Sequence, residues 1–154
     1  MEIRLAKTAG FCFGVNRAVE LTYGLLAEGH KVATLGPLIH NPQAVEDMRR
    51  KGAQVVDTVQ DVPAGCEVVI RSHGVPRSVY DELEARGIPY HDATCPFVAK
   101  IHRLARRAGE EGRTLLVAGD ENHPEVQGIV GHTRGSVFVL SLIHISEPTR
   151  LGMI

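Results

Sequence analysis

The sequence predicts an α/β protein made of repeated units with mainly parallel sheets. Strand-like and helix-like patterns of apolar residues alternate over residues 1–140, which favours this architecture. The continuous apolar run Val68, Val69 and Ile70 is typical of a strand buried on both faces of a parallel sheet. A third observation is an internal repeat, because the histidines His40 and His123 lie 28 residues after the cysteines Cys12 and Cys95.

The repeat has an offset of 83 residues, and it holds beyond the cysteines and histidines. Glycines recur where elements end and valines recur at positions expected in a core, as in Val15 and Val98, Glu28-Gly29 and Glu111-Gly112, Gly36 and Gly119, Gly52 and Gly135, and Val56 and Val139. Self-similarity at a fixed period indicates copies of one structural unit. We expect a first α/β unit at residues 1–92 and an incomplete second unit at residues 93–140.

The first unit is expected to contain these elements in order. Alternation over residues 2–7 predicts a strand, and helical spacing over residues 15–26 predicts a helix that ends at Gly29. A strand follows at residues 31–35. Asn41 caps the next helix with Pro42 at its first position, and this helix ends near Gly52. Strands are then expected at residues 53–56 and 67–71.

The remaining elements continue the same alternation. Pro76 opens a helix that Gly87 ends, and residues 88–91 form a strand that leads to Cys95. Pro96 begins a long helix that reaches about residue 112. A strand at residues 114–118, a helix from His123 and a last strand at residues 137–140 complete the pattern.

Composition excludes several function classes. A formal net charge of −1 argues against a partner with a phosphate backbone such as a nucleic acid. We find neither a run of 18 apolar residues nor an amino-terminal export signal, so we expect a cytoplasmic protein without a membrane partner. Three cysteines in that compartment point to thiol chemistry or metal binding rather than to disulfides.

Two of the three cysteines are candidates for metal ligands. Cys12 and Cys95 both stand where a helix should begin, and the positive end of a helix favours the thiolate that binds metals. Cys66 has no counterpart in the repeat and precedes an apolar strand, so we interpret it as a packing residue. Zinc and iron-sulfur chemistry both remain open, although zinc-binding cysteines usually occur in close pairs and none are close here.

Three histidines are expected together at one rim of the protein. His40, His73 and His123 follow predicted strands, and ligands of open α/β sheets bind at the carboxyl ends of the strands. Such a group favours an anionic ligand or a metal. Glu125 shares a helix start with His123, where it either compensates the helix dipole or donates a proton beside the site.

Five motifs in this order resemble the 4-hydroxy-3-methylbut-2-enyl diphosphate reductase family, the oxidoreductases of the last step of the methylerythritol phosphate route of isoprenoid biosynthesis. They are AGFCFGV at 9–15, GPLIHN at 36–41, RSHGV at 71–75, DATCP at 92–96 and HPEV at 123–126. The resemblance runs from residue 1 to about residue 140. It implies three α/β lobes around a pseudo-threefold axis, each giving one cysteine to a central 4Fe-4S cluster.

Site roles follow from the same resemblance. Cys12 and Cys95 would be two cluster ligands, His40, His73 and His123 would contact the allylic diphosphate substrate, and Glu125 would handle the proton. Three cysteine ligands would leave the fourth iron open as a Lewis acid for the substrate hydroxyl. Two electrons, from a donor of the ferredoxin or flavodoxin type, and a proton from Glu125 would expel water and leave an allyl species. A second proton, added to that species, would yield isopentenyl or dimethylallyl diphosphate.

The chain departs from the family pattern at its end. The third cysteine ligand is absent, and Cys66 does not replace it because it lies within the first unit. Residues 141–154 follow neither period and look like the translation of a sequencing adapter. We therefore expect a truncated fragment of a reductase, inactive alone and without an intact cluster, whose exposed apolar flank makes it poorly soluble.

Two other function classes remain alternatives. One is a non-enzymatic two-repeat module that binds a metal or an anion, with Cys12, Cys95, His40 and His123 as four zinc ligands. The other is a hydro-lyase that uses an open iron without net reduction. Turnover with and without a low-potential electron donor separates the hydro-lyase from the reductase.

Overall fold

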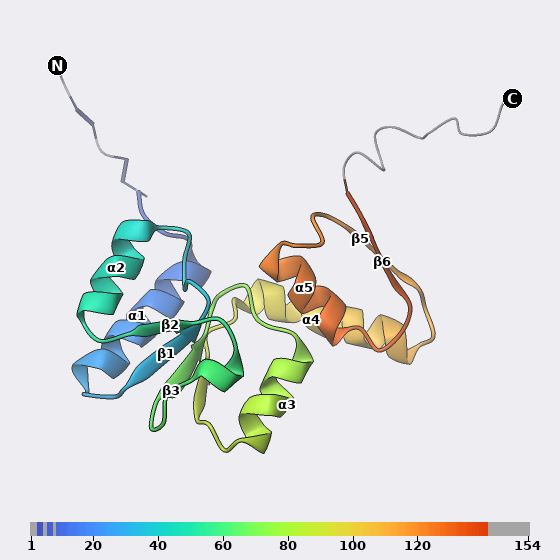
Figure 1. Cartoon of the computed structure of the whole chain (residues 1–154). Coiled ribbons are helices and arrows are strands. Elements are labelled where there is room, and N and C mark those ends of the chain that lie inside the picture. The colour runs from blue at the N-terminus through green and yellow to red at the C-terminus, as the bar shows by residue number, and fades with distance from the viewer. Residues whose placement is uncertain (1–2, 5, 8, 142–154) are drawn as a thin grey trace, which may run out of the picture.

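The computed structural model of the chain describes residues 3–4, 6–7 and 9–141, in which helices and strands alternate (Figure 1). The elements are α1 Phe13–Ala27, β1 Val32–Leu35, α2 Pro42–Arg50, β2 Gln54–Val56, the 3₁₀ turn η1 Val59–Asp61, β3 Glu67–Ile70, α3 Arg77–Ala85, β4 Tyr90–Asp92, α4 Pro96–Glu110, β5 Leu115–Ala118, α5 Pro124–His132 and β6 Val137–Leu140. The expected α/β class is confirmed, whereas the sequence pattern gave no indication of η1.

The first four strands form one parallel sheet in the order β2-β1-β3-β4, with helices on both faces. Val32 and Val69 pack into a core cluster with residues of α1 and α2. Ala33, Val68 and Ile70 point the other way and pack with residues of α3 and η1. Burial on both faces explains why these strands are apolar without alternation.

The second unit repeats the first. The bounds of α4 and β5 equal those of α1 and β1 plus 83 residues, and β5 pairs in parallel with β6 as β1 pairs with β2. Helices α1 and α4 also end alike, with Gly29 at φ +85° and Gly112 at φ +70°. The backbone N–H of the residue after each glycine donates to the corresponding carbonyl, of Leu25 or of Ala108. The internal repeat is therefore present in three dimensions.

One detail of the repeat needs correction. Gly36 N–H donates to the carbonyl of Val56, and Gly119 N–H donates to the carbonyl of Leu140. Leu140 is therefore the structural counterpart of Val56, one residue later than the Val139 expected from a constant offset. The division into domains at residues 92 and 93 remains a prediction, although β4 does close the first sheet.

The strand expected at residues 2–7 is wrong for its described part. Residues 3–4 and 6–7 form no strand, Ile3 is 82% exposed, and Ala9 N–H donates to the carbonyl of Ala6 in a turn. Alternation alone does not make a strand, because the strand also needs a neighbour that satisfies its backbone groups. The tail at residues 142–154 lies outside the described residues.

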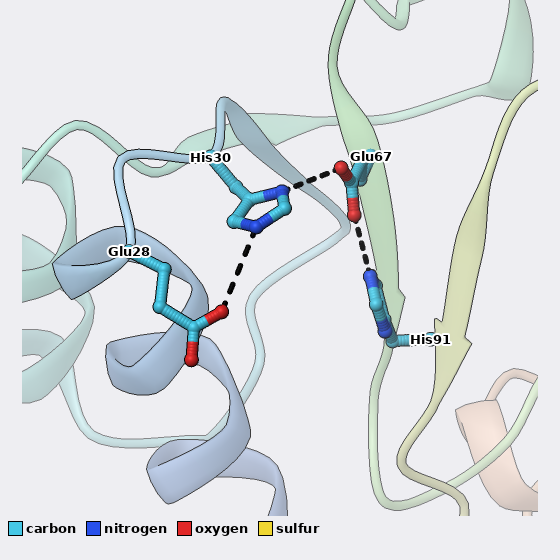
Figure 2. A network of polar contacts seen from close by, with 4 residues as sticks. All are labelled: Glu28, His30, Glu67 and His91. Atoms are coloured by element: carbon cyan, nitrogen blue, oxygen red, sulfur yellow. Dashed lines mark hydrogen bonds and ion pairs between the residues drawn. The ribbon is translucent and has the colours of Figure 1, made fainter.

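A polar network ties the amino ends of β1 and β3 to β4 (Figure 2). The two oxygens of Glu67 lie 2.6 Å from His30 Nδ1 and 2.6 Å from His91 Nε2, and His30 Nε2 lies 3.6 Å from Glu28. Hydrogen bonds from His91 and then His30 lower the pKa of the Glu67 carboxyl. His30 and His91 therefore have a structural role. They lie at the end of the sheet opposite the loops that carry His40 and His73.

Candidate active site at the carboxyl ends of the strands

Cys12 and Cys95 occupy equivalent places at the starts of α1 and α4. Each is the residue before the first helical turn, and each accepts a backbone hydrogen bond of 2.9 Å at its carbonyl, from Asn16 or from Ala99. Neither thiol caps its helix; Cys12 is exposed and Cys95 half-buried. Both sulfurs therefore remain available at positive helix ends, where a thiolate is favoured.

The two cysteine-bearing segments are in contact. A Cβ atom at Gly14, two residues after Cys12, would lie 2.8 Å from the sulfur of Cys95. Arg17 of α1 donates from Nη1 to the carbonyl of Thr94 over 3.0 Å. Glycine at position 14 is what permits this approach, so the start of α1 packs directly against the start of α4.

The three histidines predicted at one rim lie together. The ring of His73 stands between the others, with centroids 5.3 Å from His40 and 5.9 Å from His123. They come from the loops after β1, β3 and β5, which lie in two separate sheets. The three imidazoles form a compact polar surface that becomes positively charged when the rings are protonated. A surface of this kind can bind an anion.

The ring of His73 is partly buried. Burial is the main cause that lowers its pKa, followed by the charges of Arg71, His40 and His123. Its Nδ1 atom is buried and has no hydrogen-bond partner among the described residues. A buried orphan nitrogen is costly, and an anionic ligand would both satisfy it and favour its protonated form.

His123 and Glu125 form the start of α5. The Nδ1 atom of His123 accepts a hydrogen bond of 3.2 Å from the backbone N–H of Glu125. Because Nδ1 accepts, the neutral ring carries its proton on Nε2, which remains free to donate. Glu125 lies in the first turn, half-buried, and its side chain remains available for proton transfer.

Two residues near the site were not predicted as site residues, although the first of them belongs to the RSHGV motif. Arg71, two residues before His73, sends its guanidinium over Gly36 at the start of the loop that carries His40. Behind the loop of His73, His102 of α4 packs against Gly74, where an added Cβ would lie 2.6 Å from His102 Cε1. An arginine directly after an apolar strand was a usable signal for the first, whereas the second is visible only in three dimensions.

The thiols suit a metal or cluster, but they are not a complete site. Among the described residues, no three side chains of histidine, cysteine, aspartate or glutamate are placed to hold one metal ion. The four-ligand zinc module that would use Cys12, Cys95, His40 and His123 thus gains no support from the side-chain arrangement. Cys66 is buried in the core beside α3, which confirms it as a packing residue.

The comparisons with known proteins agree with these observations. The family described as LytB protein matches residues 3–152. The 4-hydroxy-3-methylbut-2-enyl diphosphate reductase of Thermoanaerobacter sp. (strain X514) is 40% identical over 147 residues, covering 93% of this chain and 51% of that protein. The protein of the same name from Syntrophotalea carbinolica is 43% identical over 142 residues, covering 92% and 50%.

Solved structures give the same result. A structure of (E)-4-hydroxy-3-methyl-but-2-enyl diphosphate reductase, described as the terminal enzyme of the non-mevalonate pathway, aligns with a TM-score of 0.79 and 39% identity. It covers 95% of this chain and 53% of that chain. The Plasmodium falciparum reductase aligns with a TM-score of 0.84 at 23% identity, covering 96% and 46%, which supports the fold alone.

The chain spans about half the length of the curated relatives it matches. No helix in the described ranges is long and apolar enough to cross a membrane. Nearly the whole chain takes part in each match, and the motif order, the repeat and the parallel sheets agree with them. This chain therefore belongs to the LytB protein family.

Proposed function

We propose that this chain carries one part of the active site of a 4-hydroxy-3-methylbut-2-enyl diphosphate reductase. The observation that carries the proposal is the grouping of His40, His73 and His123. The ring centroid of His73 lies 5.3 Å from that of His40 and 5.9 Å from that of His123. Names of relatives that act on a diphosphate support the same ligand class. The site would work in the cytoplasm, with reducing equivalents from a ferredoxin-like or flavodoxin-like donor.

The histidines would bind the diphosphate. His123 offers an Nε2–H donor because its Nδ1 accepts from the backbone of Glu125. His73 has a buried nitrogen without a partner, and an anion would raise its lowered pKa and convert it into a charged donor. His40, in the loop after β1, is exposed and is the third member of the group. Together they orient the anionic end of the substrate.

The cysteines would hold a 4Fe-4S cluster. Cys12 and Cys95 fit as thiolate ligands, because both stand free at helix starts that contact each other at Gly14. Such a cluster, when bound, supplies electrons and a Lewis-acidic iron. The family pattern implies a third cysteine, which would come from a segment outside this sequence. Glu125 would donate a proton to the departing oxygen of the substrate.

A chimera tests the proposal. Residues 3–140 of this chain replace the matching half of the Thermoanaerobacter reductase, and turnover is measured anaerobically with a low-potential donor. We expect turnover by the chimera and its loss in Cys12→Ser, Cys95→Ser and Glu125→Gln, with Cys66→Ser as the control that keeps activity. A folded, cluster-containing chimera without turnover would overturn the assignment. Turnover without any donor would instead identify a hydro-lyase.

A further inference from the structure

Arg71 is a half-buried cation without a counterion. It follows β3 directly, and its Nε atom is buried and lacks a hydrogen-bond partner. Within the described part of the chain no carboxylate pairs with it, and burial lowers the pKa of its guanidinium. A charge removed from water without a partner is costly, so a protein that keeps one usually uses it. The exposed arginine Arg77, by contrast, is paired with the carboxylate of Asp81.

The guanidinium of Arg71 lies across the neighbouring histidine loop. Its Nη1 atom is 2.8 Å from the point where a Cβ of Gly36 would stand. Gly36 has φ +70° and is the first residue after β1, in the loop that leads to His40. Strands β1 and β3 are neighbours in the sheet, so the two loops leave it side by side. Glycine at this position serves both the turn and the approach of the arginine.

Arg71 also begins the loop of His73. Only Ser72 separates the two residues, and the charge of Arg71 is the second cause, after burial, of the lowered pKa of His73. Arg71 further lines a cavity of about 590 Å³ together with Gly36 and Pro37. One side chain therefore touches both histidine loops and adds positive charge to them.

We propose that Arg71 is a positioning residue of the histidine site, whose guanidinium packs across Gly36, fixes the loop of His40 against the loop of His73 and adds charge that favours an anion. The anion-binding consequence rests on the proposed function, whereas the loop contact does not. A long cation suits this place, since its Nη1 end reaches the space beside Gly36 and keeps its charge at the site. Lysine at position 71 would keep the charge but lose the contact that the guanidinium makes at Gly36.

Two measurements on the full 154-residue chain separate these parts. The first records amide hydrogen exchange at residues 36–40 and the imidazole NMR signals of His40 and His73, without any ligand. The second titrates the chain with inorganic diphosphate. Wild-type protein is compared with Arg71→Met, Arg71→Lys and the control Arg77→Met, which removes an exposed arginine that pairs with Asp81.

In Arg71→Met and Arg71→Lys we expect faster amide exchange at residues 36–40 and shifted NMR signals of His40. The amide exchange rate in the core strands β1 and β3 should not change. Diphosphate affinity should fall about tenfold in Arg71→Met and about threefold in Arg71→Lys, since lysine retains the charge. Arg77→Met should match wild type in both measurements.

Wild-type exchange and wild-type histidine signals in Arg71→Met would overturn the proposal. Exchange that becomes faster by the same factor in every element would also overturn it, because that pattern marks a general loss of stability. If the wild-type chain does not bind diphosphate, the proposed function loses its support, while the exchange measurement still decides the role of Arg71.

Discussion

The imidazole of His102 stacks on the imidazole of His132, with ring centroids 4.3 Å apart and planes inclined by 20°. Both rings are buried, where α4 and α5 meet each other behind the loop of His73. His132 Nε2 lies 3.1 Å from the carbonyl of Val75, whereas His102 Nε2 is buried without a partner. Two stacked rings of this kind tolerate the neutral state and resist protonation.

The first prediction concerns acid stability. Burial, and then the charge of His132, lowers the pKa of His102 to about 4, and burial also lowers the pKa of His132. The charges that face the pair are Arg106, Arg77 and Asp92, and only Asp92 opposes the lowering. The unfolded chain takes up protons near pH 6.5 and the folded chain does not, so folding stability falls as pH drops from 6.5 towards 4.

For His102 alone this loss amounts to at most about 3 kcal/mol at pH 4. Urea unfolding at pH 7, 5.5 and 4.5 measures it in wild-type protein and in His102→Gln. We expect a shallower pH dependence in His102→Gln. The same slope in both proteins would contradict a neutral, buried His102.

A second prediction tests the contact between the cysteine segments. Gly14→Ala places a methyl group 2.8 Å from the sulfur and the Cβ of Cys95, and overpacking of this kind costs about 1–3 kcal/mol. Gly24→Ala, in the same helix with nothing within 4 Å, should instead stabilise the chain by up to about 1 kcal/mol. Thermal unfolding and the alkylation rate of Cys95 check both. An unchanged alkylation rate in Gly14→Ala would show that the two segments are apart.

A third prediction concerns Glu67, which bonds to His30 and His91 (Figure 2). Its pKa is lowered in the folded state by these hydrogen bonds, so its contribution to stability is present above the ordinary carboxyl pKa and disappears as pH falls through the lowered value. Glu67→Gln should therefore unfold at lower urea concentration at pH 6 than wild type. The difference should shrink as pH falls below the ordinary carboxyl pKa. Glu46→Gln, which affects only an exposed pair with Arg50, is the control.

A fourth prediction follows from an exposed apolar surface on the second unit. Phe97, Ile101 and Leu104 are exposed along α4, and Leu116 and Phe138 are exposed and paired in register across β5 and β6. Apolar patches of this kind promote association. The chain should self-associate in sedimentation velocity experiments, and Leu116→Ser with Phe138→Ser should shift it towards monomer. A wild-type chain that stays monomeric at high concentration would contradict this.

Much of the fold was readable from the sequence because local rules and the repeat agreed. Asn41 caps α2 through a hydrogen bond of 3.0 Å from Ala44 N–H, as its type and the following Pro42 indicated. Cys12 and Cys95 both precede helices, as the offset of 83 required. The proximity of His40 and His73 also followed from one rule, that loops after parallel strands of one sheet meet at one edge. His123 joins them from the second sheet, which this rule does not cover.

Other features depend on contacts that no local pattern encodes. The stacking of His102 on His132 joins residues 30 apart in two helices, and each looks like an ordinary helical position in the sequence. Arg71 lies close to Gly36 because β1 and β3 are neighbouring strands in the sheet. The strand expected at residues 2–7 failed in its described part for the opposite reason, since a correct local pattern found no neighbouring strand.

The most direct test is an NMR titration of the histidine side chains with inorganic diphosphate at pH 6.5. The rings of His40, His73 and His123 should shift together with one affinity, and His73 should take up a proton, because an anion raises its lowered pKa. The structural histidines His30, His91, His102 and His132 should stay unchanged. Shifts at the structural group, or three unrelated affinities within the proposed site, would show that these three histidines do not form one anion-binding site.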